Sequence, residues 1–164
     1  WHAMYNSRGK LYTYRFSTRS VADPLQRRTR VAVPRGEELD LEKLAKMTHI
    51  FEGTHDYQNF ANRLLHKRRM SKKGEEFTTK RYVESVELVE EREGEYRLDV
   101  RLDGALQRMV RNMMGGLWSV ARGDMEEEEL KRALEGPLYP PGRSPIRAAP
   151  AHGLTCESVY YDDY

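Results

Sequence analysis

Residues 103–123 impose the strongest constraint on the fold, because their apolar residues recur with the spacing of a helix. At about 100° per residue these side chains fall within about 60° of one line, which is typical of a helix packed on a core. Gly123 follows them and can adopt the left-handed conformation that ends a helix. The sequence therefore predicts an amphipathic helix here. Its stripe consists of Leu106, Met109, Val110, Met113, Leu117, Val120 and Ala121.

The other side of this predicted helix carries Arg108, Arg111, Asn112 and Gly115. A solvated face is the plain interpretation of such residues. However, the pair Gly115-Gly116 costs about 1 kcal/mol per glycine relative to alanine in the middle of a helix. We therefore expect another backbone or a ligand to approach this side closely.

Charge is unevenly distributed along the 164 residues, although the formal net charge is only +2. Residues 1–81 hold 18 Lys and Arg against 9 Asp and Glu, whereas residues 82–164 hold 10 against 17. A basic half favours a polyanionic partner, with solvated charge as the alternative. Two basic stretches are therefore candidate RNA contacts or solvated loops. They contain Arg27, Arg28 and Arg30 in the first and Lys67, Arg68, Arg69, Lys72 and Lys73 in the second.

Several classes of protein are disfavoured by the same composition. Cys156 is the single cysteine, which excludes an internal disulfide and fits a reducing, intracellular compartment. The 5 histidines show no metal-ligand spacing, so no metal site is expected. No apolar run approaches the length of a membrane span, and no secretory signal is visible. Because the chain opens at Trp1 in a strand-like segment, we expect it to be a fragment of a longer protein.

Alternating apolar residues predict two hairpins and a last strand. The first hairpin pairs residues 1–5 with 11–16 around a turn at Arg8-Gly9, and Tyr12 shares a face with Tyr14 and Phe16. The second pairs residues 80–90 with 95–103. The final strand runs over residues 154–161.

Capping residues predict two further helices. Asp40 can cap a helix over residues 41–51. Asp124 and Glu127 have the spacing of a capping box, and Gly136-Pro137 would end the helix that follows. The order of elements indicates the α+β class, with a mostly antiparallel sheet and helices on one face.

Four stretches, in order, resemble motifs of the TruA family of tRNA pseudouridine synthases. Together they extend over nearly the whole chain. Each would be weak alone, but their common order makes the resemblance specific. The stretches are residues 1–16 (WHAMYNSRGKLYTYRF), 53–60 (GTHDYQNF), 109–115 (MVRNMMG) and 149–154 (APAHGL).

The resemblance implies a fold of two ferredoxin-like, RNA-recognition-type halves that share one sheet, with the uridine site between them. It implies that residues 1–164 are the carboxy-terminal, catalytic-cleft part, with residues 1–16 as a crossing hairpin. The family uses an Asp in an R-T-D-x-G-V motif and no cofactor, and that motif does not occur here. Asp103 lies in a similar R-x-D-G-A string, but it leads straight into the predicted helix and is a poor candidate nucleophile. The fragment alone is therefore expected to be inactive.

Site residues follow from the resemblance position by position. Tyr12 matches the tyrosine that stacks on the target base, and Lys10 precedes it near the family's basic position, where Leu11 departs from the pattern. Arg111 matches the arginine that pairs with the catalytic Asp, and Leu154 matches the apolar floor under the uracil. A cross-strand aromatic pair for Tyr12 and plain core packing for Leu154 are the alternatives.

The sequence thus predicts an isomerase that converts uridine to pseudouridine in tRNA. The alternative is a non-catalytic RNA-binding protein that retains the same fold. The expected partner is tRNA, no membrane is expected, and a homodimer is one assembly to be tested.

Overall fold

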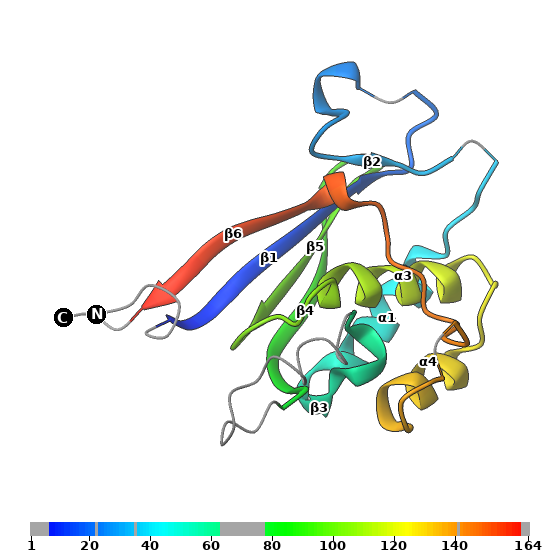
Figure 1. Cartoon of the computed structure of the whole chain (residues 1–164). Coiled ribbons are helices and arrows are strands. Elements are labelled where there is room, and N and C mark those ends of the chain that lie inside the picture. Colours follow the sequence, from blue (N-terminus) through cyan, green and yellow to red (C-terminus); the bar gives the residue numbers. More distant parts are fainter. Residues whose placement is uncertain (1–6, 22, 35, 63–77, 141, 162–164) are drawn as a thin grey trace.

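The computed structural model of the chain describes residues 7–21, 23–34, 36–62, 78–140 and 142–161. Within these residues six strands form one sheet, and helices cover one of its faces (Figure 1). The strands are β1 (Ser7–Ser17), β2 (Val31–Ala32), β3 (Gly53–Asp56), β4 (Lys80–Arg92), β5 (Glu95–Leu102) and β6 (Leu154–Tyr161). The helices are α1 (Leu41–Met47), α3 (Met109–Ala121) and α4 (Glu127–Glu135), with 3₁₀ turns at Pro24–Gln26, Thr48–Phe51, Tyr57–Phe60 and Ala151–Gly153.

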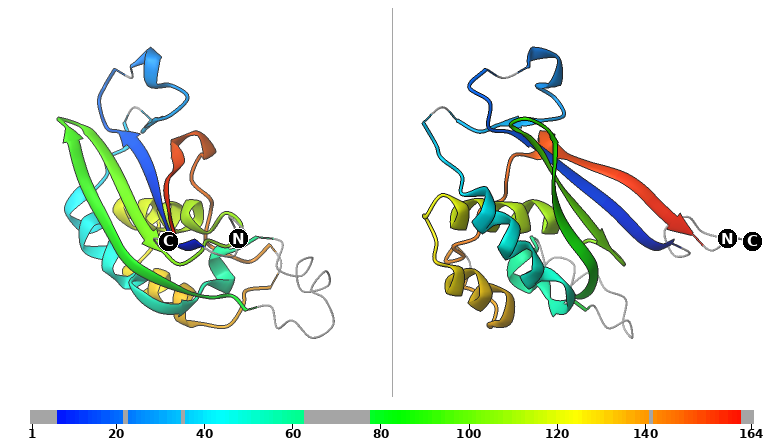
Figure 2. Two further views of the ribbon diagram at one scale, coloured as in Figure 1. Left: turned by 90° about the vertical axis from the view of Figure 1, so that its left-hand side faces the viewer. Right: turned by 180° about the vertical axis from the view of Figure 1, so that it is seen from behind.

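The sheet is mostly antiparallel, as predicted. Its order is β2-β1-β5-β4-β3, with β6 also paired to β1, and only the short β1–β2 ladder among these pairs is parallel. The predicted hairpin of β4 and β5 is confirmed, and Gly94 occupies its turn with a φ of 70°. The view from behind in Figure 2 shows the helices on one side of the strands. The predicted α+β class is therefore confirmed.

The turn predicted at Arg8-Gly9 is wrong. Both residues lie inside β1, which runs unbroken from Ser7 to Ser17. β1 pairs with β5 along one edge and with β6 along the other, so two ladders hold this segment extended. Residues 1–6, which would form the other arm of the predicted hairpin, lie outside the described residues.

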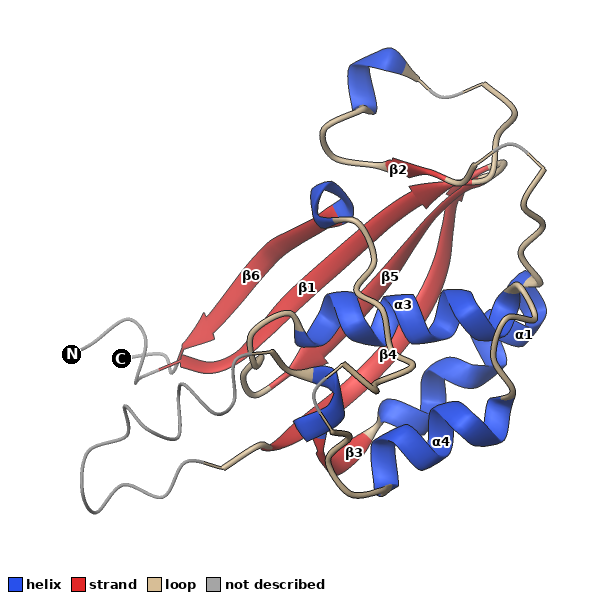
Figure 3. Cartoon of the chain, turned by 45° about the vertical axis from the view of Figure 1, so that its right-hand side comes forward, coloured by secondary structure: helices blue, strands red, loops and turns tan. Residues whose placement is uncertain are grey.

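The core lies between the sheet and α3, which crosses the strands in Figure 3. Tyr14 and Phe16 of β1 are fully buried and meet the ring of Trp118 edge to face, with ring centroids 5.9 and 5.8 Å apart. Tyr12 also packs against this core but is only partly buried. The predicted face of β1 is therefore the core face, and it points towards α3.

The amphipathic helix predicted within residues 103–123 is α3, which is shorter than predicted and more deeply buried. It begins at Met109 because Arg108 adopts a left-handed backbone, with a φ of 63°. Leu106 precedes the helix but is still buried. The side predicted to be polar is largely covered, and Asn112 is only 5% exposed. A solvated face is thus the wrong interpretation for most of this side.

The predicted caps have different outcomes. Asp40 caps α1 as predicted, with its Oδ1 accepting the N–H of Lys43 at 2.9 Å. The segment expected to continue this helix to residue 51 becomes a 3₁₀ turn after Met47. The capping box at Asp124 is wrong, because α4 begins at Glu127, and Asp124 forms an ion pair with Arg122 at 2.9 Å. The predicted end of α4 at Gly136 is confirmed.

Candidate functional site

The polar side of α3 is covered by the segment that leads into β6. A Cβ atom on Gly115 would overlap the carbonyl oxygen of Arg147, so this glycine allows the two backbones to touch. Gly116 is close to a side chain instead, since a Cβ atom there would lie 2.6 Å from Cδ1 of Leu130. The close approach expected at the glycine pair is therefore confirmed, and the neighbour at Gly115 is backbone.

Arg111 fastens the same segment at the next turn of the helix. Its Nε donates to the carbonyl of Ala149 at 2.8 Å, and its own carbonyl accepts the N–H of Ala149 at 2.9 Å. No described residue accepts a hydrogen bond from its two Nη atoms, and the side chain is half-buried. The guanidinium is therefore held in place by one nitrogen and keeps a planar pair of donors for another group.

Tyr14 holds the following residue of this segment. Its hydroxyl donates to the carbonyl of Pro150 at 2.9 Å. Burial raises the pKa of Tyr14, and the nearby charge of Arg111 offsets this only in part, so the hydroxyl remains a donor. The turn Ala151–Gly153 follows and leads into Leu154, which pairs with Tyr14 in the β1–β6 ladder. Tyr14 is thus next to Leu154 in the sheet and near enough to Arg111 for that charge to act on its hydroxyl.

Tyr12 lies two positions along β1 on the same face. It pairs with Cys156 of β6 and Val100 of β5. Partial burial, followed by the neighbouring Cys156, raises the pKa of the Tyr12 phenol, so it stays neutral at physiological pH. Lys10 continues this face beyond Tyr12, opposite Leu102 and Val159. The structure thus places Tyr12, Leu154 and Arg111 around Tyr14, which the sequence analysis did not select as a site residue.

The stretch at residues 53–60 is hydrogen-bonded to the helices behind the site. Asn112 of α3 donates to the carbonyl of Phe60 at 2.7 Å. Asn59 donates to the carbonyls of Ala133 and Pro137 at 2.9 and 3.0 Å and accepts the N–H of Tyr139 at 2.9 Å. These bonds join α3, α4 and the loop after α4. The family motif marked residues 53–60 as a matching stretch. Nothing in the sequence spacing predicted that the side chains of Asn59 and Asn112 would hydrogen-bond to backbone carbonyls of distant elements.

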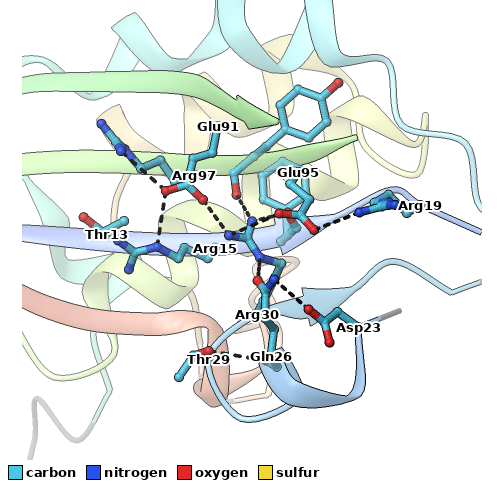
Figure 4. Close-up of polar contacts among 12 residues, drawn as sticks. Thr13, Arg15, Arg19, Asp23, Gln26, Thr29, Arg30, Glu91, Glu95 and Arg97 are labelled. Atoms are coloured by element: carbon cyan, nitrogen blue, oxygen red, sulfur yellow. Dashed lines mark hydrogen bonds and ion pairs between the residues drawn. The ribbon is translucent and has the colours of Figure 1, made fainter. Parts of the chain in front are cut away.

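The first basic stretch divides into two kinds of residue. Arg30 is nearly buried, and its guanidinium binds Glu91 at 2.6 Å and reaches the carbonyls of Phe16 and Tyr96 at 3.3 and 3.4 Å (Figure 4). Its donors are committed to the sheet, so Arg30 is corrected from a candidate RNA contact to a structural brace. Arg27 and Arg28 are exposed, and their side chains have no hydrogen-bond or ion-pair partner among the described residues.

Glu91 is the centre of the network in Figure 4. Partial burial acts to raise its pKa, but the hydrogen bond and charge of Arg30, with Arg15 and Arg97, outweigh burial and lower it. Arg15 and Arg97 are cross-strand neighbours of like charge, and their nitrogens lie 3.5 and 3.4 Å from Glu91. The carboxylate therefore allows three arginines to gather on the sheet face away from the helices.

The remaining predicted residues are placed as follows. Lys67, Arg68, Arg69, Lys72 and Lys73 lie outside the described residues. Asp103 is exposed at the end of β5, where its Oδ1 accepts the N–H of Gly104 at 2.6 Å, and no described contact joins it to Arg111. Among the residues described, no cluster of three His, Cys, Asp or Glu could hold a metal ion. In the same part of the chain, no helix has the length and apolar character needed to cross a bilayer.

Comparison with known proteins identifies relatives that match nearly the whole chain. A family model described as tRNA pseudouridine synthase matches residues 47–162. The tRNA pseudouridine synthase A of Bacillus sp. (strain KSM-64) is 27% identical over 161 residues, which are 98% of this chain and 59% of that protein. The corresponding protein of Akkermansia muciniphila is 30% identical over 163 residues, 99% of this chain and 58% of that protein. A third, tRNA pseudouridine synthase A 1 of Protochlamydia amoebophila, is 31% identical over 163 residues, 99% of this chain and 59% of that protein. The chain spans a little over half the length of these relatives.

Proposed function

Because this chain belongs to the family of tRNA pseudouridine synthases, we propose that it provides the uridine-holding part of such an enzyme. One observation carries this proposal. Arg111 and Tyr14 clamp two consecutive carbonyls, those of Ala149 and Pro150, in the segment that leads into Leu154. This arrangement brings three separate stretches of the chain to one place. The two Nη atoms of Arg111, which no described residue binds, lie there with a tyrosine and an apolar side chain.

The proposed reaction isomerises uridine in tRNA without a cofactor. A carboxylate, supplied by an R-T-D-x-G-V segment outside these 164 residues, attacks C1′ of the extruded uridine, so a C1′–O bond forms as the bond between N1 and C1′ breaks. The uracil rotates, and a bond forms between C5 and C1′ as the C1′–O bond breaks and frees the carboxylate. C5 then loses its proton, and N1 gains one. No other reactant is consumed. Base extrusion costs a few kcal/mol, which stacking on Tyr12 partly offsets.

Each site residue has one task in this proposal. The Nη atoms of Arg111 hold the attacking carboxylate ionised and oriented through two parallel hydrogen bonds. Leu154 supports the uracil from below, and Lys10 lies beyond Tyr12 where it can meet the substrate backbone. We also propose that residues 1–164 form the carboxy-terminal part of the enzyme. A homodimer is a further proposal, and the outer edge of β6, which no described strand pairs, is where a second copy would add.

Tritium release from tRNA labelled at C5 of uridine tests the proposal, because C5 loses its hydrogen in the reaction. We expect release by a polypeptide that joins these residues to an R-T-D-x-G-V segment and none by residues 1–164 alone. Release by the chain alone would place the nucleophile within it, and Asp103→Asn would then be the first variant to make. If the joined polypeptide binds tRNA but releases no tritium, the chain belongs to a non-catalytic RNA-binding protein.

The second basic stretch gives a separate prediction about tRNA affinity. If Lys67, Arg68 and Lys72 contact phosphates, replacing all three with glutamine should reduce the log–log slope of affinity against salt by roughly two to three. The loss should be similar for different RNA sequences, because phosphate contacts carry no sequence information. Filter binding of tRNA over a salt series measures the slope. An unchanged slope would identify the stretch as solvated.

A further inference from the structure

The loop between β1 and β2 projects from the end of the sheet in Figure 1, and hydrogen bonds brace its described residues, 18–21 and 23–30. The two carboxylate oxygens of Asp23 accept the N–H of Leu25 at 2.9 Å and the side-chain amide of Gln26 at 3.0 Å. Arg30 then ties Gln26 to the sheet, with its Nε 2.5 Å from Oε1 of Gln26 (Figure 4). The described part of this loop therefore has a fixed shape before any partner binds.

The tip of this loop presents side chains that the fold does not use. Leu25 is 93% exposed and Val21 is 70% exposed. Arg27 and Arg28 are exposed beside them, and neither side chain is paired within the described chain. Single exposed apolar residues are common, but a braced turn that holds out apolar and unpaired basic side chains together is typical of an interaction surface.

A groove of about 320 Å³ separates this loop from the segment that enters β6. Val31, Ala32 and Pro150 form its apolar part, while Ser17, Gln26 and His152 line it with polar groups. The size is at the lower end of ordinary ligand pockets, which begin at about 300 Å³. Pro150 lines this groove, and its carbonyl accepts the hydrogen bond from the Tyr14 hydroxyl, so the groove and the proposed uridine site share the segment that leads into β6.

The charge around the groove indicates what it can accept. Asp23 and Glu95 border it as well as Arg27 and Arg30. Glu95 is only 3% exposed and is paired with Arg19 and Arg30, whereas Asp23 is occupied by the turn. These carboxylates disfavour a phosphate inside the groove, while the unpaired Arg27 lies among its lining residues with an exposed side chain. A neutral planar group with its own donors and acceptors suits the interior better.

We propose that this groove binds the base of a nucleotide adjacent to the target uridine, with Arg27 contacting the neighbouring phosphate. The proposal rests on the function proposed above. Bases of unpaired RNA bind proteins by stacking on imidazole or guanidinium planes and by hydrogen bonds from their edges. His152 and Arg27 offer the planes, and Ser17 and Gln26 offer the hydrogen-bonding groups.

Filling the groove is the direct test. Ala32 is exposed on the short strand β2, so Ala32→Trp can occupy the groove without entering the core. With unfractionated tRNA as the probe and residues 1–164 as the protein, we expect affinity to fall by about tenfold, the effect of losing one stacked base. The salt slope should not change, since no phosphate contact is lost. Leu138→Trp, at an exposed position on the loop after α4, is the matched control and should bind as the unaltered chain does.

Arg27→Ala and His152→Ala test the phosphate contact and the stacking surface of the groove separately. Arg27→Ala should lower the salt slope by about one, as expected for one phosphate contact. His152→Ala should weaken tRNA binding several-fold and leave the salt slope of affinity unchanged. This variant is a second test of the groove if Ala32→Trp alters the thermal unfolding of the chain. Arg143→Ala, at an exposed position after α4, is the control for charge.

The outcomes separate this proposal from the proposed function. If the unaltered chain binds tRNA and both groove variants bind within twofold of it, the groove proposal is wrong while the proposed function stands. If the unaltered chain shows no affinity for tRNA at low salt, both are wrong. Loss of affinity by Ala32→Trp and His152→Ala, with both controls unaffected, would establish the groove as part of the RNA-binding surface.

Discussion

Replacing Arg111 with alanine is expected to abolish pseudouridine formation by a polypeptide that joins these residues to an R-T-D-x-G-V segment. The guanidinium keeps both Nη atoms free of the described residues, and a preorganised donor to a reacting group contributes about a hundredfold to a thousandfold in rate. Affinity for tRNA should change only a few-fold, because Arg111 is half-buried and not part of an exposed basic surface. Tritium release and filter binding on the same preparation measure the two effects.

Arg111→Lys distinguishes the pairing role from a purely structural one. A lysine can still donate to the carbonyl of Ala149, but it lacks the planar fork that binds a carboxylate through two parallel bonds. We therefore expect the lysine variant to remain inactive while its thermal stability recovers. Recovery of turnover in the lysine variant would reduce Arg111 to an anchor for the segment before β6. Arg143→Ala should retain full activity in the same assays.

Gly115→Ala is expected to lower the free energy of unfolding of this chain by about 2 to 4 kcal/mol. The added methyl group would overlap the carbonyl oxygen of Arg147 and would lie 3.1 Å from the backbone nitrogen of Ala149. Both neighbours are backbone atoms, and Ala149 is also held by Arg111, so the segment has little freedom to move away. This cost exceeds the gain of about 1 kcal/mol that alanine brings to a helix interior. Urea unfolding followed by circular dichroism measures the change.

Gly116→Ala is the matched control, since it adds the same atom one position along the same helix. Its methyl group would meet Cδ1 of Leu130 at 2.6 Å, and that atom is the end of a side chain that can change its rotamer. We expect its stability to stay within about 1 kcal/mol of the unaltered chain. Equal stability of the Gly115 and Gly116 variants would show that the segment at residues 147–149 is not packed tightly against α3.

Much of the fold follows from local patterns in the sequence. Alternating apolar residues, among them Leu98 and Val100, predicted the hairpin of β4 and β5, and the structure pairs these strands antiparallel around a turn at Gly94. The apolar stripe of α3 predicted the core helix, and the cost of Gly115-Gly116 predicted close contact on its other side. These predictions succeeded because hydrophobic periodicity and the helix propensity of glycine depend only on residues that are close together in the sequence.

Other features depended on which distant segments meet. Arg30 has the same chemistry as Arg27, yet it is a brace, because Glu91 lies 2.6 Å away across a separation of 61 residues. Arg8-Gly9 is a plausible turn in isolation, but β5 and β6 both pair with β1 and keep it extended. Tyr14 drew no attention as a site residue because its role comes from the carbonyl of Pro150, 136 residues away. The sequence by itself determined the class of the fold, the hairpin of β4 and β5, the apolar stripe of α3 and the motifs that identify the family. Only the tertiary structure decided which polar groups are satisfied internally and which have no partner among the described residues. Hydrogen bonds and ion pairs are short-range, and their long-range partners are fixed only when the chain packs.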